Sequence, residues 1–108
     1  MAFKKYKGLD KYHIRVHKTI KHPSIIVDDD GSYLSCYDTT TSRKKYLSRK
    51  KSYRPLKSKL SGKDEKSYVH IQRKIDKRNR LSKPYNNSHL VDEDIKLIDK
   101  LELRNKKK

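Results

Sequence analysis

Residues 23–41 read PSIIVDDDGSYLSCYDTTT, and this stretch carries the strongest local fold signal of the chain. A β-branched run, SIIV, is followed by three aspartates and Gly31, and then by an alternating run that begins at Ser32. Aspartate followed by glycine between two strand-like runs is the strongest short-range signal of a β-hairpin. The sequence therefore predicts two paired strands, and the continuous apolar character of SIIV is typical of a strand covered on both faces.

Shorter strand-like runs flank this hairpin. Residues 12–17 alternate between Tyr12, Ile14 and Val16 on one side and His13, Arg15 and His17 on the other. This alternation predicts a half-buried strand with a strongly cationic outer face. The run SYVHI at 67–71 predicts another strand, and residues 74–81 predict a short polar crossing anchored by Ile75 and Leu81.

The last third of the chain predicts an amphipathic helix. Val91, Ile95, Ile98 and Leu101 fall at helical spacing, with acidic residues at 92–94 and basic residues after the last turn. This charge order suits the helix macrodipole, and the apolar stripe is expected to lie across the sheet. We predict one mostly β domain with a terminal helix over 12–104, a flexible basic arm over 1–11 and a basic tail over 105–108.

Composition restricts the setting of the protein. The 30 basic and 13 acidic residues give a formal net charge of +17, and a polyanion should stabilise a fold with that much self-repulsion. The single cysteine, Cys36, excludes an intramolecular disulfide framework, suits a reducing and hence cytoplasmic compartment, and is expected to be a buried structural thiol. No stretch approaches the ~18 consecutive apolar residues of a membrane span, so no membrane partner is expected.

The segment from Arg43 to Lys59, RKKYLSRKKSYRPLKSK, is dense in positive charge and contains no acid. Cations that meet phosphates release counterions, and the interleaved tyrosines offer flat faces on which unpaired bases can stack. We interpret the segment as a basic loop inserted between strands that binds single-stranded RNA, with a solvated linker as the alternative. The predicted RNA-binding residues are Arg15, Lys21, Arg43, Lys44, Lys45, Tyr46, Arg49, Lys50, Lys51, Tyr53, Arg54 and Arg73.

The order of these motifs resembles the MazF/PemK toxin family of small, SH3-like β-barrels. His22-Pro23 before SIIV is similar to the Arg-Pro dipeptide of that family, with histidine in place of arginine. Thr41-Ser42 ends the second strand of the hairpin, and residues 67–81 are similar to the later strand and its K-I-D-K-x-R-L motif, with one extra residue before Arg80. Residues 25–45 also resemble the ToxN/AbiQ branch of the same fold.

The resemblance implies an activity. Members of the family cut single-stranded RNA without a metal ion or other cofactor, by activating the ribose 2′-hydroxyl against the adjacent phosphate, and they pair with a protein or RNA antitoxin and dimerise through a barrel face. By position, His22 would replace the catalytic arginine, and Thr41 and Ser42 would hydrogen-bond the scissile phosphate. Histidine suits this task because its pKa of ~6.5 allows proton transfer near neutral pH.

Each of these interpretations has an alternative. His22 can also be explained as an extended loop residue before a proline, and Thr39–Thr41 equally as a β-branched strand end without a chemical role. The function can also be that of a non-catalytic RNA- or nucleoprotein-binding protein, such as a phage-encoded inhibitor or a ribosome-associated factor, which the histidine-for-arginine difference favours. Duplex DNA is a weaker candidate ligand, because no helix-turn-helix pattern or basic helix is evident.

Overall fold

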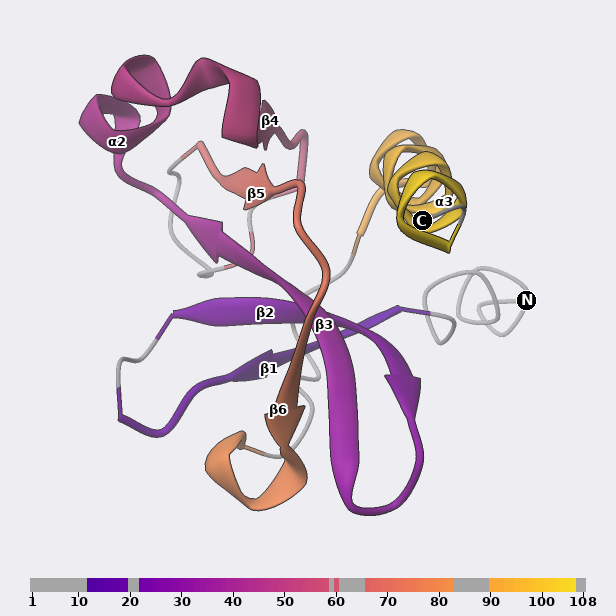
Figure 1. Cartoon of the computed structure of the whole chain (residues 1–108). Coiled ribbons are helices and arrows are strands. Elements are labelled where there is room, and N and C mark those ends of the chain that lie inside the picture. Colours follow the sequence, from indigo (N-terminus) through magenta and orange to yellow (C-terminus); the bar gives the residue numbers. More distant parts are fainter. Residues whose placement is uncertain (1–11, 20–21, 59, 61–65, 83–89, 107–108) are drawn as a thin grey trace, which may run out of the picture.

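The computed structural model describes residues 12–19, 22–58, 60, 66–82 and 90–106 (Figure 1). The predicted basic arm (1–11), Lys21 and the end of the predicted tail (107–108) lie outside the described residues. In chain order the elements are β1 (His13–Val16), β2 (Pro23–Asp29), β3 (Tyr33–Thr40), α2 (Arg43–Ser48), η1 (Lys50–Ser52), β4 (Tyr53–Pro55), β5 (Tyr68–His70), β6 (Lys74–Lys77), η2 (Arg78–Arg80) and α3 (Asp92–Lys106). The fold is therefore mostly β with a C-terminal helix, as predicted.

The strands form one open antiparallel sheet with the order β1-β2-β3-β5-β4, and β6 also pairs with β3. The predicted hairpin is β2 and β3, with Ser24 opposite Asp38 and Ile26 opposite Cys36. Gly31 in its turn has a φ of +97°, a left-handed conformation that favours glycine. The Asp30 carboxylate accepts hydrogen bonds from two backbone N–H groups of the turn, and these bonds lower the pKa of Asp30.

One edge of β3 serves two partners in succession. Residues 33–36 pair with β6, and residues 39–40 pair with β5, so a bend at 71–73 separates β5 from β6. The segment predicted as a polar crossing thus contains a strand. The prediction that Ile75 anchors it is wrong, because Ile75 is 65% exposed, whereas Leu81 is buried as predicted. Strand alternation places Ile75 on the outer face and Lys74 and Asp76, which form an ion pair, on the other.

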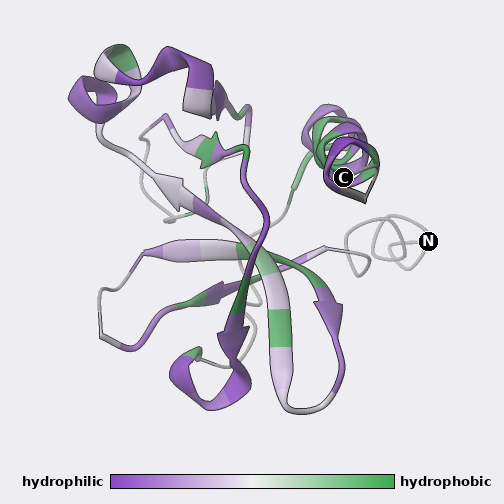
Figure 2. Cartoon of the chain, in the orientation of Figure 1, coloured by the Kyte–Doolittle hydropathy of each residue, from purple (hydrophilic) through white to green (hydrophobic). Residues whose placement is uncertain are grey.

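Hydrophobic residues lie along the strands and along α3 (Figure 2), and the buried ones form two clusters. Ile98 and Leu101 of α3 pack in a cluster with Ile25 and Tyr37, which confirms that the helix lies across the sheet. Ile26 belongs to a second cluster, with Leu34, Cys36 and Leu81. Because adjacent residues of β2 enter different clusters, this strand is covered on both faces, as its sequence predicts. Val91, predicted on the apolar stripe, precedes the helix and is exposed.

A polar cluster at the end of α3 fixes the bend between β5 and β6. Glu102 Oε1 accepts hydrogen bonds from Tyr37 Oη at 2.7 Å and from Arg73 Nε at 2.9 Å. Asn105 Nδ2 donates to the carbonyl oxygen of Ile71 at 3.2 Å and to Tyr37 Oη at 3.0 Å. The helix therefore holds residues 71–73 in place, and with them the side chains at the ends of β5 and β6.

The basic segment is not a loop, so this prediction is wrong. It folds as α2, η1 and β4, and Ser42 caps α2 by accepting a hydrogen bond from Lys45 N at 3.1 Å. Lysine and arginine are good helix formers, and no glycine or proline interrupts the run before Pro55. Tyr46 of α2 stacks on Tyr68 of β5, with ring centroids 4.3 Å apart. The basic charge is thus presented on ordered backbone.

None of the described helices is long and apolar enough to cross a membrane.

Candidate functional site

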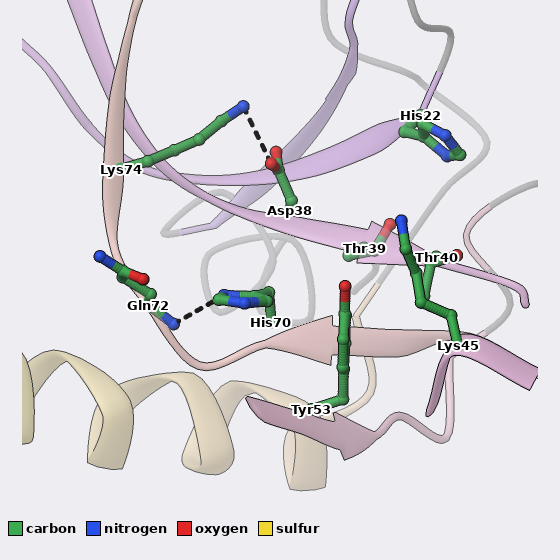
Figure 3. A pocket seen from close by; sticks show the side chains of 9 residues that line it. All are labelled: His22, Asp38, Thr39, Thr40, Lys45, Tyr53, His70, Gln72 and Lys74. Carbon is green, nitrogen blue, oxygen red and sulfur yellow. Dashed lines mark hydrogen bonds and ion pairs between the residues drawn. The ribbon is translucent and has the colours of Figure 1, made fainter. Parts of the chain in front are cut away.

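A cleft of about 400 Å³ lies between the end of β3 and the α2, β4, β5 and β6 segments (Figure 3). Two imidazoles, two ammonium groups, a phenol, two hydroxyls, an amide and one carboxylate surround it. They belong to His22, His70, Lys45, Lys74, Tyr53, Thr39, Thr40, Gln72 and Asp38. The cleft therefore combines groups that transfer protons with groups that bind anions.

Two of the rings are positioned by strand pairing. Tyr53 of β4 is the register partner of His70 of β5, and their rings meet edge to face with centroids 5.0 Å apart. The backbone N–H of Gln72 donates to His70 Nδ1 at 3.2 Å, a contact that the bend at 71–73 makes possible. A neutral His70 consequently carries its proton on Nε2, which acts as a hydrogen-bond donor and not as a base.

The charges of the cleft are only partly compensated. Lys74 Nζ lies 2.9 Å from Asp38 Oδ2, and Ser24 Oγ donates to Asp38 Oδ1 at 3.0 Å. Burial opposes the charged form of Lys74, but the hydrogen bond and attraction of Asp38 outweigh it and raise the Lys74 pKa. No described carboxylate forms an ion pair with Lys45, so the positive charge of Lys45 remains available to an anionic ligand.

The hydroxyls of Thr39 and Thr40 form different hydrogen bonds. Thr39 Oγ1 donates to the carbonyl oxygen of Pro23 at 2.7 Å, which ties the end of β3 to the start of β2 beside His22. Thr40 Oγ1 accepts a hydrogen bond from Ser42 N at 3.1 Å. Because that bond uses a lone pair of the hydroxyl, the Thr40 proton can be donated to a bound anion.

No protein-family model, curated protein or solved structure matches this chain. The function is therefore argued from the cleft itself. Among the described residues, no group of three or more His, Cys, Asp and Glu side chains could hold a metal ion. Acid–base and electrostatic chemistry by the lining side chains is what this arrangement can provide.

The structure places the predicted catalytic residues unevenly. His22 lines the cleft, and its side chain is exposed. Thr41 and Ser42 are exposed and are not among the lining residues, whereas Thr39 and Thr40 are. Of the predicted RNA-binding residues, Lys45 and Tyr53 line the cleft.

The remaining predicted RNA-binding residues fall into two groups. Five cations of α2, η1 and the junction between them are exposed: Arg43, Lys44, Arg49, Lys50 and Lys51. Three others have structural contacts. Arg54 Nη1 donates to three backbone carbonyls at 2.9–3.4 Å, Arg73 pairs with Glu102, and one face of Tyr46 is covered by Tyr68.

Arg15 differs from its predicted place. The prediction of a cationic outer face on β1 is wrong for this residue, because Arg15 is buried and contacts His13 and the carbonyl oxygen of Ser82. The reason is that the chain at 80–82 lies along the edge of β1, where the carbonyl oxygen of Ser82 accepts a hydrogen bond from Arg15, while Ile14 enters the first cluster.

Sequence reasoning did not place six lining residues in the site: Asp38, Thr39, Thr40, His70, Gln72 and Lys74. Their convergence depends on β4 pairing with β5 and on the bend that follows β5. Because residues 43–59 are interpreted from the sequence as a loop, nothing in that interpretation indicates that residues 53–55 form a strand that pairs with β5. The alternation of SYVHI places His70 on the opposite face from Val69, and this is the one local signal that pointed to it.

Proposed function

We propose that this protein binds single-stranded RNA and cleaves it in the cleft without a metal ion. One observation carries the proposal: His22, His70, Lys45 and the Thr40 hydroxyl converge on a cleft whose one described carboxylate is already paired with Lys74. The exposed cations of α2 continue from Lys45, and they offer a path for the phosphate backbone on a chain of net charge +17.

The proposed reaction is an internal transesterification. His22 accepts the proton of the ribose 2′-hydroxyl, whose oxygen attacks the adjacent phosphorus. His70 Nε2–H, the Thr40 hydroxyl and the Lys45 ammonium stabilise the negative charge that develops on the phosphorane oxygens. The bond to the 5′ oxygen breaks, and this oxygen takes a proton from Lys45. The products are a 2′,3′-cyclic phosphate and a 5′-hydroxyl end.

The relation to the MazF/PemK and ToxN/AbiQ barrels is part of this proposal. It is supported by contacts between the chain after β6 and the free edge of β1. Leu81 forms a β-bridge with His17, and Ser82 N donates to the carbonyl oxygen of Val16 at 2.8 Å. Such contacts bring the two edges of a strongly curved sheet together, as a small barrel requires. If the chain is such a protein, we expect it to be a cytoplasmic toxin that pairs with a protein or RNA antitoxin and forms a homodimer.

The decisive experiment is incubation of the purified protein with mixed single-stranded RNA in excess chelator. We expect discrete fragments that end in a cyclic phosphate, and a single 2′-deoxy substitution at a cut site should abolish that cut. His22→Gln and His70→Asn should each slow cleavage by ~10²-fold or more. His17→Gln removes an imidazole outside the cleft and is the matched control. Intact RNA after incubation with the wild-type protein rejects the enzymatic function.

A second candidate function is RNA binding without cleavage. It is favoured by the absence, among the described side chains, of any hydrogen bond that orients the His22 ring as a base. His70, held as a donor by Gln72 N–H, would then bind phosphate only. Salt-sensitive binding of RNA that remains intact would identify this function.

A further inference from the structure

A second groove, of about 850 Å³, lies between the β2–β3 turn, η2 and the end of β1. It is separate from the cleft, because the two share no lining residue. Four cations line it, namely Arg15, Lys18, Lys77 and Arg78, and none of its described lining residues is acidic. Two carboxylates adjoin it: Asp29 Oδ2 lies 3.4 Å from Arg78 Nη2, and Asp30 Oδ1 accepts hydrogen bonds from the backbone N–H groups of Ser32 and Tyr33. The groove therefore has an excess of positive charge.

Arg15 gives this groove a built anion-binding group. Its side chain is 8% exposed, with Nε donating to His13 Nε2 at 2.9 Å and Nη1 donating to the carbonyl oxygen of Ser82 at 3.2 Å. No described residue accepts a hydrogen bond from Nη2, yet no buried side-chain nitrogen or oxygen among the described residues lacks a partner. Arg15 lines the groove, and Nη2 is the nitrogen of its guanidinium group that the hydrogen bonds to His13 and Ser82 leave available to a ligand there.

The electrostatic environment of Arg15 agrees with this role. Burial, and then repulsion from Arg78, lower its pKa, while Asp29 acts in the opposite direction. An anion in the groove would lie near both guanidinium groups and would relieve their repulsion. Planar guanidinium groups suit phosphate oxygens, which they can bind through paired hydrogen bonds.

Tyr33 adds a flat apolar surface at the same place. It lines the groove, is 46% exposed and begins β3 directly after the turn. The opposite end of β3 supplies Thr39 and Thr40 to the cleft. Seven residue steps separate Tyr33 from Thr40, which is about 23 Å along an extended strand. A single nucleotide cannot occupy both places, but an RNA strand of several nucleotides can.

We propose that this groove is a second contact site for the same single-stranded RNA, in which Arg15, Lys18, Lys77 and Arg78 bind neighbouring phosphodiesters and Tyr33 stacks on a base. The inference rests on the proposed RNA binding and extends it from the point of cleavage to a distant part of the strand. A long RNA then binds through both places, whereas a very short RNA binds through one.

The test compares two double variants that each remove two positive charges. Lys18→Gln/Lys77→Gln alters the groove, and Lys96→Gln/Lys100→Gln alters the exposed side of α3. Fluorescence anisotropy with 2′-O-methyl oligonucleotides of ~4 and ~16 nucleotides, which span the usual range of site sizes, measures binding without cleavage. For the longer probe, the slope of log affinity against log salt should fall by ~1.4 in the groove variant, from ~0.7 per lost contact, and stay unchanged in the control.

The aromatic contact has its own test. Tyr33→Ala should weaken binding of the longer probe by about tenfold, while Tyr33→Phe should keep the wild-type affinity. Equal salt slopes for the two double variants would overturn the second site and leave the cleft proposal intact. Failure of the wild-type protein to bind the longer probe would overturn both proposals. If the groove variant lost affinity for polyglutamate but not for RNA, the ligand would be an acidic protein segment, and the inference would be wrong.

Discussion

Replacing Lys45 with methionine should slow RNA cleavage by about 10²–10³-fold, because this ammonium group is the uncompensated cation of the cleft. Lys74 cannot replace it, since Lys74 Nζ is held 2.9 Å from Asp38. A unit charge about 4 Å from a developing oxyanion contributes ~4 kcal/mol at an effective dielectric constant of ~20, which is an upper limit of roughly 10³ in rate. Loss of one preorganised donor to an oxyanion typically costs ~10²–10³-fold, in agreement.

The matched control is Lys44→Met, which removes the same charge from the same short helix at a position that does not line the cleft. Single-turnover cleavage in chelator, with protein in excess over a labelled RNA, separates the chemical step from binding. Anisotropy with a non-cleavable RNA measures affinity in parallel. We expect similar small losses of affinity in both variants and a large loss of rate in Lys45→Met alone. Equal rates for the two variants, or a Lys45 effect on affinity only, would refute the role given to Lys45.

Three further predictions concern the supporting structure. Burial, with a smaller contribution from Asp38, raises the pKa of Cys36 to about 12, so the thiol of the folded protein should resist labelling by maleimide at pH 8. The stability of the fold should decline as pH rises above ~8.5, because the thiol ionises there in the unfolded chain only. Rapid stoichiometric labelling would contradict this prediction. Asp94→Ala should lower the free energy of unfolding, measured with urea, by about 3 kcal/mol, because this 2%-exposed carboxylate accepts hydrogen bonds from Lys57 N, Ser58 N and Ser58 Oγ. A decrease below ~1 kcal/mol would be inconsistent with those contacts. Tyr37→Phe should lower the free energy of unfolding by about 2 kcal/mol, the value of a hydrogen bond to a charged group. A double-mutant cycle with Glu102→Gln should show energetic coupling between the two side chains, and additive effects would exclude that hydrogen bond as the cause.

The parts of the fold that sequence predicts are those determined by neighbouring residues. The hairpin follows from SIIV, the aspartates and Gly31, whose left-handed φ is the reason that glycine stands in the turn. The terminal helix follows from the spacing of Ile98 and Leu101 and from the acidic first turn. Both signals are local, so they do not depend on how the rest of the chain is arranged.

The parts that sequence does not predict are set by contacts between distant segments. In the sequence, Arg54 and Arg73 look the same as the exposed cations of α2. In the structure, Arg54 donates to backbone carbonyl oxygens and Arg73 pairs with Glu102. His70 is equivalent to any strand histidine until β4 pairs with β5 and the bend supplies Gln72 N–H. Charge density therefore predicts the class of ligand, while tertiary pairing decides which cations face it.

The division of charge within the fold explains why so basic a chain can be compact. Several of its carboxylates hold the structure together: Asp38 pairs with Lys74, Asp94 binds backbone N–H groups at 57–58, and Glu102 joins α3 to the sheet. Acids used in this way cannot neutralise the cations of α2 and η1, which remain exposed. The excess positive charge is thus concentrated on surfaces that no described part of the chain covers. Because self-repulsion of this size opposes folding, a ligand that places phosphates on those surfaces would stabilise the protein as it binds.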